Sequence, residues 1–204
     1  MILLDYIVNL SIFSLLVSVP LILRSFISHK PLKDLHLLGG IYAGIISVIL
    51  VGLSFNEQGY SYDIRYAILI LVFSYLGPGA GIITAIIALV TRLAISENWL
   101  PAIIGLLLIL IAFTVIHKYC RQHKAVRKTA ILYGVYCAIY IITVPIIFNV
   151  FRDSPIFHLQ YILFVGLGVI VGSLLIESYE RLIRIITEKS GWKRRWKKVN
   201  LNTG

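Results

Sequence analysis

The segment that decides the fold reads SYDIRYAILILVFSYLGPGAGIITAIIALVTR and covers residues 61–92. Two apolar runs flank a Gly-Pro-Gly turn at 77–79, and an arginine borders each run at the end away from the turn. Arg65 lies 13 residues before Pro78, and Arg92 lies 14 residues after it. If the two runs form antiparallel helices, both guanidinium groups lie at the same end of the hairpin.

The spacing also predicts the depth of these arginines in a bilayer. At about 1.5 Å rise per residue they lie roughly 20 Å from the turn, whereas the hydrocarbon core is about 30 Å thick. With the turn at one surface, both would lie inside the membrane or at the floor of a cavity. An arginine at such a depth costs roughly 2.5–3.5 kcal/mol and usually has a partner or a function. The alternative is that each side chain extends to the lipid headgroups and does nothing else.

The composition predicts a polytopic membrane protein with an all-α fold. Of 204 residues, 59% are apolar and 14% are charged, too few charged side chains to cover a soluble domain of this size. The first apolar run has no basic residue before it and no cleavage pattern, so we expect a retained helix. Cys120 and Cys137 have no metal-binding or redox spacing and are interpreted as packing residues.

Hydropathy predicts seven spans, at 2–23, 35–55, 66–76, 80–90, 99–117, 129–148 and 157–176. Six spans remain possible if one of the short helices around Gly77 is only half-inserted. Counting Lys and Arg in alternate connections gives 16 on one side and three on the other. By the positive-inside rule, this predicts a cytoplasmic C-terminus and an N-terminus outside.

Two of the predicted spans contain closely spaced glycines, a pattern that lets helix backbones approach one another. They are Gly39, Gly40 and Gly44 in the second span, and Gly166, Gly168 and Gly172 in the seventh.

The residues after the seventh span differ in character. Residues 177–189 predict an amphipathic helix, with an apolar stripe and an i,i+4 pair of Glu180 and Arg184. The stripe consists of Leu182, Ile185 and Ile186. Residues 191–198 then carry five cations and two tryptophans, which favours an anchor on anionic lipid over nucleic-acid binding. We expect the lipid bilayer as a partner, and no nucleic acid.

The paired arginines predict a site for a small anion. An arginine fork matches a carboxylate in bidentate geometry, so Arg65 and Arg92 together could hold a small organic acid. Tyrosines near them could supply hydroxyl groups and walls, and Trp99 could close the mouth of the site. Asp63 would orient or neutralise Arg65, or else serve as an ordinary helix N-cap. The tyrosines are Tyr60, Tyr62 and Tyr66.

Catalytic chemistry is not expected. The sequence has no phosphate-binding loop, no His-Glu-x-x-His and no Gly-x-Ser-x-Gly. The nine acidic residues are scattered singly, and none of the five histidines pairs with a carboxylate at ligand or triad spacing. We therefore predict no enzyme activity, no metal and no cofactor.

Several motifs together resemble a known receptor domain. They are Asp63-Ile64-Arg65, the following apolar helix, the glycine-rich break at 77–81 and Thr91-Arg92-Leu93. Over residues 35–176 the chain resembles the five-helix input domain of LytS-type sensor histidine kinases and related membrane diguanylate cyclases. The resemblance implies signal transduction at a bacterial plasma membrane, as in two-component phosphorelay sensors, with small acids such as pyruvate among the cues. Residues 101–106 have neither the cysteine nor the serine that some pyruvate-responding relatives are thought to use, so pyruvate itself is not supported.

This resemblance divides the chain into three parts. Residues 1–34 hold the first transmembrane helix and a cytoplasmic loop, 35–176 hold the receptor core, and 177–204 hold the amphipathic helix and basic tail. The kinase or GGDEF output domain of the family is missing, so the chain is either truncated or a stand-alone receptor. A stand-alone receptor would act on a separate signalling partner or as a homodimer.

The leading hypothesis is therefore a membrane receptor module. A small anion held by the arginines would shift the third and fourth helices relative to the seventh, and the helix at 177–189 would carry the change inward. One alternative is the substrate-binding membrane subunit of an energy-coupling-factor transporter, which is similar in size and has no output domain. Another is a structural or assembly protein without a ligand.

Overall fold

The computed structural model describes residues 2–26, 35–57, 60–95, 99–147 and 155–201. Within these ranges the chain forms seven α-helices and one short β-hairpin. The helices are α1 (Ile2–Phe26), α2 (Leu35–Gly52), α3 (Arg65–Tyr75), α4 (Pro78–Ile95), α5 (Trp99–Tyr119), α6 (Ala125–Ile141) and α7 (Pro155–Leu201). The strands are β1 (Phe55–Glu57) and β2 (Tyr60–Tyr62). A π-helix, Ile142–Ile147, continues α6 and contains Pro145.

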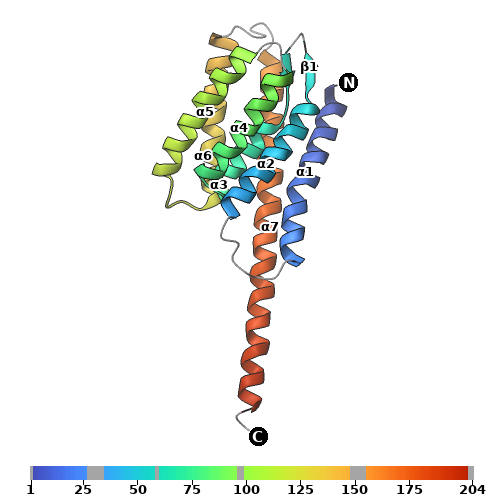
Figure 1. Cartoon of the computed structure of the whole chain (residues 1–204), viewed down its shortest axis with the longest axis vertical. Coiled ribbons are helices and arrows are strands. Elements are labelled where there is room, and N and C mark those ends of the chain that lie inside the picture. Colours follow the sequence, from blue (N-terminus) through green and yellow to red (C-terminus); the bar gives the residue numbers. More distant parts are fainter. Residues whose placement is uncertain (1, 27–34, 58–59, 96–98, 148–154, 202–204) are drawn as a thin grey trace.

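The helices form a bundle in which consecutive helices run in opposite directions (Figure 1). The N-terminus and the β-hairpin lie at one end, and α7 leaves the bundle at the other end toward the C-terminus. The predicted set of seven helices is confirmed for the described part of the chain. The connection between α5 and α6 lies at the end from which α7 emerges, as alternation requires.

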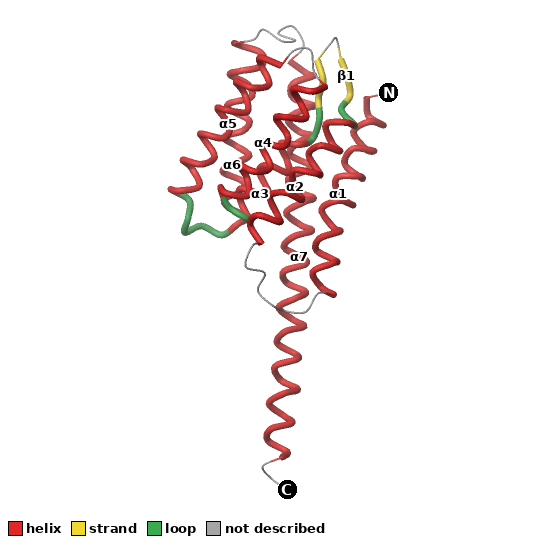
Figure 2. Tube along the Cα trace, viewed as in Figure 1, coloured by secondary structure: helices red, strands yellow, loops and turns green. Residues whose placement is uncertain are grey.

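The predicted second span is too long at its C-terminal end. It was expected to reach residue 55, but α2 ends at Gly52 and Phe55 begins β1. Figure 2 shows the two strands in yellow beside the N-terminus. The strands are antiparallel, with Asn56 opposite Ser61, where the sequence predicted a loop.

The hairpin of α3 and α4 forms as predicted, with a tighter turn. Gly77 alone takes a left-handed backbone conformation (φ 92°), which a residue without a Cβ adopts at little cost. Pro78 already begins α4, because proline has no N–H to leave unsatisfied in the first turn of a helix. Both arginines lie at the end of the hairpin opposite this turn.

Helix α7 differs from the prediction in length. It is one helix of 47 residues, and Gly191 does not end it. The basic segment at 191–198 was expected to be a separate tail but continues the same helix. As a result, α7 projects far beyond the other helices (Figure 1).

Helix α3 occupies the centre of the bundle, and its residues from Ala67 to Ser74 are all buried. It contacts α2, α4, α5, α6 and α7. A helix that is apolar on every side is stable only when it is surrounded in this way. Because α3 has 11 residues, the centre of the molecule is only about 16 Å long.

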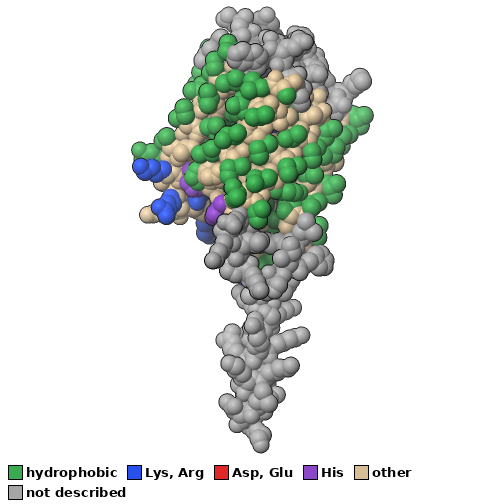
Figure 3. Space-filling view, viewed as in Figure 1, with side chains coloured by type: hydrophobic (Ala, Val, Ile, Leu, Met, Phe, Trp, Pro, Cys, Tyr) green, Lys and Arg blue, Asp and Glu red, His purple; other side chains and the backbone are tan. Residues whose placement is uncertain are grey.

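The outer helices expose large apolar side chains, among them Val90 (62% exposed) and Ile111 (62%). Figure 3 shows such side chains spread over one face of the bundle, with Lys and Arg gathered near one end of that face. Two helical stretches, Ala125–Ile146 and Pro155–Ile185, are long and apolar enough to cross a membrane. The other apolar helical stretches among the described residues are shorter than 18 residues.

The glycines of α2 form a close seam with α4, as their spacing predicted. A Cβ built on Gly40 would lie 2.9 Å from the carbonyl oxygen of Ala80, and one built on Gly44 would contact the side chain of Ile87. The Thr84 hydroxyl donates a hydrogen bond across this seam to the Gly40 carbonyl (3.0 Å). The two backbones are therefore as close as the absence of side chains allows.

Gly40→Ala is expected to destabilise the protein by about 1–3 kcal/mol, because the added methyl group must displace backbone rather than a flexible side chain. The matched control is Gly134→Ala on α6, where an added Cβ meets nothing within 4 Å. That control should be neutral or stabilising by up to about 1 kcal/mol, because alanine is the better helix former. Unfolding by sodium dodecyl sulfate titration measures both variants, and equal stability of the two would contradict the seam.

Candidate functional site

The N-terminus of α3 holds a buried ion pair. Asp63 is 2% exposed, and its Oδ1 lies 3.4 Å from Nε of Arg65. The same oxygen accepts a hydrogen bond from the backbone N–H of Arg65 (3.0 Å). Asp63 thus faces the guanidinium group, the first of the two roles that the sequence left open, but it is not the helix N-cap, because Ile64 holds that position without a side-chain cap.

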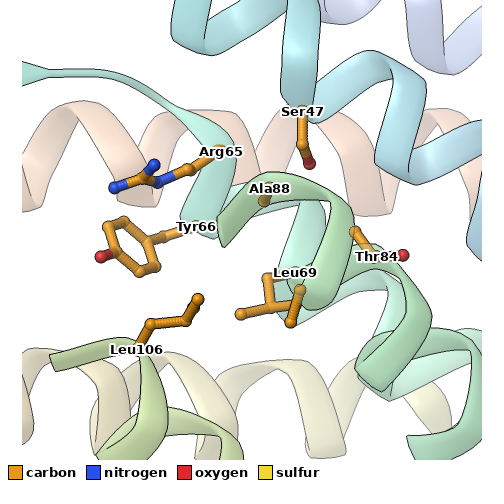
Figure 4. Close-up of a pocket in the computed structure, with 8 residues that line it drawn as sticks. Ser47, Arg65, Tyr66, Leu69, Thr84, Ala88 and Leu106 are labelled. Atoms are coloured by element: carbon orange, nitrogen blue, oxygen red, sulfur yellow. The ribbon is translucent and has the colours of Figure 1, made fainter. Parts of the chain in front are cut away.

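Two tyrosines contact the ion pair of Asp63 and Arg65. The hydroxyl of Tyr161 on α7 donates a hydrogen bond to the backbone carbonyl of Asp63 (2.9 Å). The guanidinium carbon of Arg65 lies 5.1 Å from the centre of the Tyr66 ring, within the range of a cation–π contact. Figure 4 shows the Arg65 guanidinium group beside the ring of Tyr66.

Arg92 reaches the same place from the last turns of α4. Its side chain is 7% exposed, and its charge interacts with those of Arg65 and Asp63. Arg65 and Arg92 are therefore both buried at the same end of the α3–α4 hairpin, as the spacing predicted. Two guanidinium groups and the single carboxylate of Asp63 leave one net positive charge, which attracts anions in a medium of reduced dielectric.

A small cavity lies beside Arg65, between α2, α3, α4 and α5 (Figure 4). Its volume is about 10 Å³, the size of a single water molecule. The lining residues are Ser47, Arg65, Tyr66, Leu69, Thr84, Ala85, Ala88 and Leu106. Ser47 is 1% exposed, and its hydroxyl has no hydrogen-bond partner among the described residues. This cavity is too small for an organic acid.

A cluster of aromatic rings, which the sequence did not predict, packs against Tyr66 next to Arg65. Tyr66 packs on Tyr136 (5.1 Å between ring centres), and Tyr140 packs on Tyr161 (5.2 Å). The Tyr140 hydroxyl lies 2.9 Å from Nδ1 of His158. In the sequence, the signal was the spacing of tyrosines at 133, 136 and 140, which places them on one face of α6.

Some predicted site residues cannot be located as side chains. The side chains of Tyr60, Tyr62 and Trp99 lie outside the described residues, so their predicted roles stay predictions. The same holds for Ile186 in the stripe of the signalling helix.

The described part of that helix is open to its surroundings, with Leu182 53% exposed and Ile185 46% exposed. The expected ion pair of Glu180 and Arg184 is not formed. Within the described residues, the structure records an ion pair only between Arg65 and Asp63.

The two guanidinium groups are suited to binding an anion. Guanidinium groups stay protonated and cannot serve as general bases, but they donate several hydrogen bonds in fixed directions. The described residues contain no group of three or more His, Cys, Asp or Glu side chains that could hold a metal ion.

Comparison with protein-family models, with characterised proteins and with solved structures finds no significant match to this chain.

Proposed function

We propose that this protein is a receptor module of a bacterial plasma membrane that binds a small anion through Arg65 and Arg92. The observation that carries the proposal is the convergence of two buried arginines at one end of the bundle. The LytS-like motifs at 63–65 and 91–93 support the same reading. In this proposal the ligand arrives from the extracytoplasmic side and the response leaves through α7.

A membrane location is supported by the outer surface of the bundle. Large apolar side chains are exposed on α1, α2, α4, α5, α6 and α7, as expected for helices that face lipid. The exposed cations Lys118, Arg121 and Lys124 lie on the connection at the end where α7 emerges. We propose seven membrane spans with this basic end in the cytoplasm, because cytoplasmic loops carry an excess of Lys and Arg.

The chemistry of the site supports a carboxylate or a similar anion. A guanidinium group next to a carboxylate already makes such a contact in the unliganded protein, since Asp63 faces Arg65. An external acid would compete for, or add to, this contact. Because the cavity beside Arg65 holds about one water molecule, an organic acid bound there would require the surrounding helices to move apart.

The length of α7 favours a receptor over a transporter subunit. An uninterrupted helix of 47 residues, attached to the arginine site through Tyr161, is a means of carrying a signal away from the bundle. A substrate-binding subunit of an energy-coupling-factor transporter needs no such helix. Co-purification with ATPase subunits would favour the transporter, whereas a partner protein that binds residues 177–201 would favour the receptor.

The test is the binding of acetate, pyruvate and lactate to the purified full chain in nanodiscs, measured by calorimetry. Arg65→Ala and Arg92→Ala should each weaken binding about 10- to 100-fold, because a hydrogen bond to a charged group contributes about 1.5–3 kcal/mol. Arg65→Lys and Arg92→Lys keep the charge but lose the fork, and they should also bind more weakly.

Arg127→Ala is the control, because Arg127 is exposed on α6 and distant in sequence from the pair. It should bind like the wild type. If the arginine variants fold and bind as the wild type does, or if no acid binds to any variant, the anion site is wrong.

A further inference from the structure

Helices α3 and α7 contact each other from the arginine end of α3 downward. At that end, the Tyr161 hydroxyl donates to the carbonyl of Asp63 (2.9 Å), and both residues are 2% exposed. About two turns further along α7, Gly168 faces Ile64 and Ala67, and a Cβ on this glycine would lie 2.6 Å from the Ile64 side chain. The two helices are therefore joined by a hydrogen bond and by close packing at the arginine end of α3.

The contacts continue to the other end of α3. Gly172 faces the Leu71 side chain so closely that a Cβ there would overlap it. At the last residue of α3, the Tyr75 hydroxyl donates to Oε1 of Glu177 (3.2 Å). The α3 residues 64, 67, 71 and 75 are spaced by three or four, so they form one stripe along the helix. This stripe lies against α7 over the whole length of α3.

The contact between α3 and α4 is different at its two ends. Near the turn the ring of Phe73 fills the space beside Gly81. At the arginine end the small cavity separates Arg65 from Thr84 and Ala88 of α4. The α3–α4 contact is thus filled by a ring near the turn and contains a cavity of about 10 Å³ beside Arg65.

Helix α4 is instead held to α2. The glycine seam and the hydrogen bond from Thr84 to Gly40 fix these two helices together. Arg65 therefore lies on a helix that α7 contacts along its whole length, and Arg92 lies on a helix that is joined closely to α2.

We infer that α3 and α7 form one rigid unit, so that a change at the arginine site moves the projecting part of α7 directly. This differs from a shift of α3 and α4 together relative to α7, which the sequence suggested. The sensing role of the unit rests on the proposed function, but the unit itself is tested without any ligand. Tyr161 and Glu177 are positioning residues, since they act through α3 and not on a bound anion.

The test is hydrogen exchange of the full chain in nanodiscs, followed by mass spectrometry of peptides from α2, α3, α4 and α7. Tyr161→Phe and Tyr75→Phe each remove one interhelical hydrogen bond and leave the ring in place. Each should speed exchange about fivefold in both α3 and the 161–177 part of α7, and leave α2 and α4 unchanged.

Tyr42→Phe is the matched control, because its hydroxyl donates to the Leu16 carbonyl (2.8 Å) and so joins α2 to α1. It should speed exchange in α1 and α2 and leave α3 and α7 as they are. If Tyr161→Phe affects α7 alone, or affects α2 and α4 as much as α3, the rigid unit is refuted. If the wild type binds no carboxylate but the variants show the exchange changes predicted here, only the anion site is refuted.

Discussion

Replacing Asp63 with alanine is expected to lower the free energy of unfolding by about 3–5 kcal/mol, the cost of removing one partner of a buried ion pair. Arg65 is 8% exposed and would keep its charge without the carboxylate that faces it. The backbone N–H of Arg65 would also lose its acceptor at the start of α3. The central helix of the bundle would then begin with an unpaired backbone N–H at Arg65 and a buried charge without its counter-charge.

Unfolding by sodium dodecyl sulfate, followed by far-ultraviolet circular dichroism, measures this loss. Glu180→Ala is the control, because Glu180 is exposed on α7 and surface substitutions usually change stability by less than about 0.5 kcal/mol. The double variant Asp63→Ala/Arg65→Leu should be more stable than Asp63→Ala alone, since it removes the buried charge as well. A loss below about 1 kcal/mol in Asp63→Ala would place the pair in the class of exposed ion pairs and contradict the structure.

Phe73→Ala is the second substitution with a large expected effect, a destabilisation of about 3–5 kcal/mol. Phe73 is fully buried, packs edge-to-face on Phe113 of α5 (5.4 Å between ring centres) and fills the space beside Gly81. In the proposed membrane location, this loss would come mainly from missing van der Waals contacts, because lipid is as apolar as the side chain. The closed end of the α3–α4 hairpin would contain a void.

Tyr119→Ala is the control for an aromatic truncation, because Tyr119 is 81% exposed at the end of α5. It should change stability by less than about 0.5 kcal/mol, as is usual for surface substitutions. Phe73→Leu should recover more than half of the loss, since it keeps most of the volume. Equal stability of Phe73→Ala and Tyr119→Ala would show that the ring does not close the hairpin.

The α3–α4 hairpin was predictable because its signals are local. A left-handed glycine at 77, a proline at the first position of α4 and two apolar runs of similar length act within 28 residues. The placement of Arg65 and Arg92 at one end follows from counting residues alone. The glycine seam between α2 and α4 was predictable for the same reason, since the spacing of small residues is visible without a partner.

The contacts that define the site could not be predicted in this way, because they join residues that are far apart in the sequence. Tyr161 is 98 residues from Asp63, and only the packing of α7 on α3 brings them together. The β-hairpin at 55–62 has three-residue strands, which are too short for an alternating pattern to stand out. The helix predicted at 177–189 continues through Gly191, because a glycine inside a helix costs only about 1 kcal/mol.

The short length of α3 gives the site an electrical property. At about 16 Å this helix is much shorter than the roughly 30 Å hydrocarbon core, so in the proposed orientation Arg65 lies part of the way through the insulating layer. A charge that crosses a potential of 100 mV completely changes in energy by about 2.3 kcal/mol. An anion that enters from outside moves toward a negative interior and pays a fraction of this energy. The fraction of the protein with an anion bound at the arginine pair would therefore fall as the membrane potential becomes more negative inside. It would rise when the membrane potential is lost.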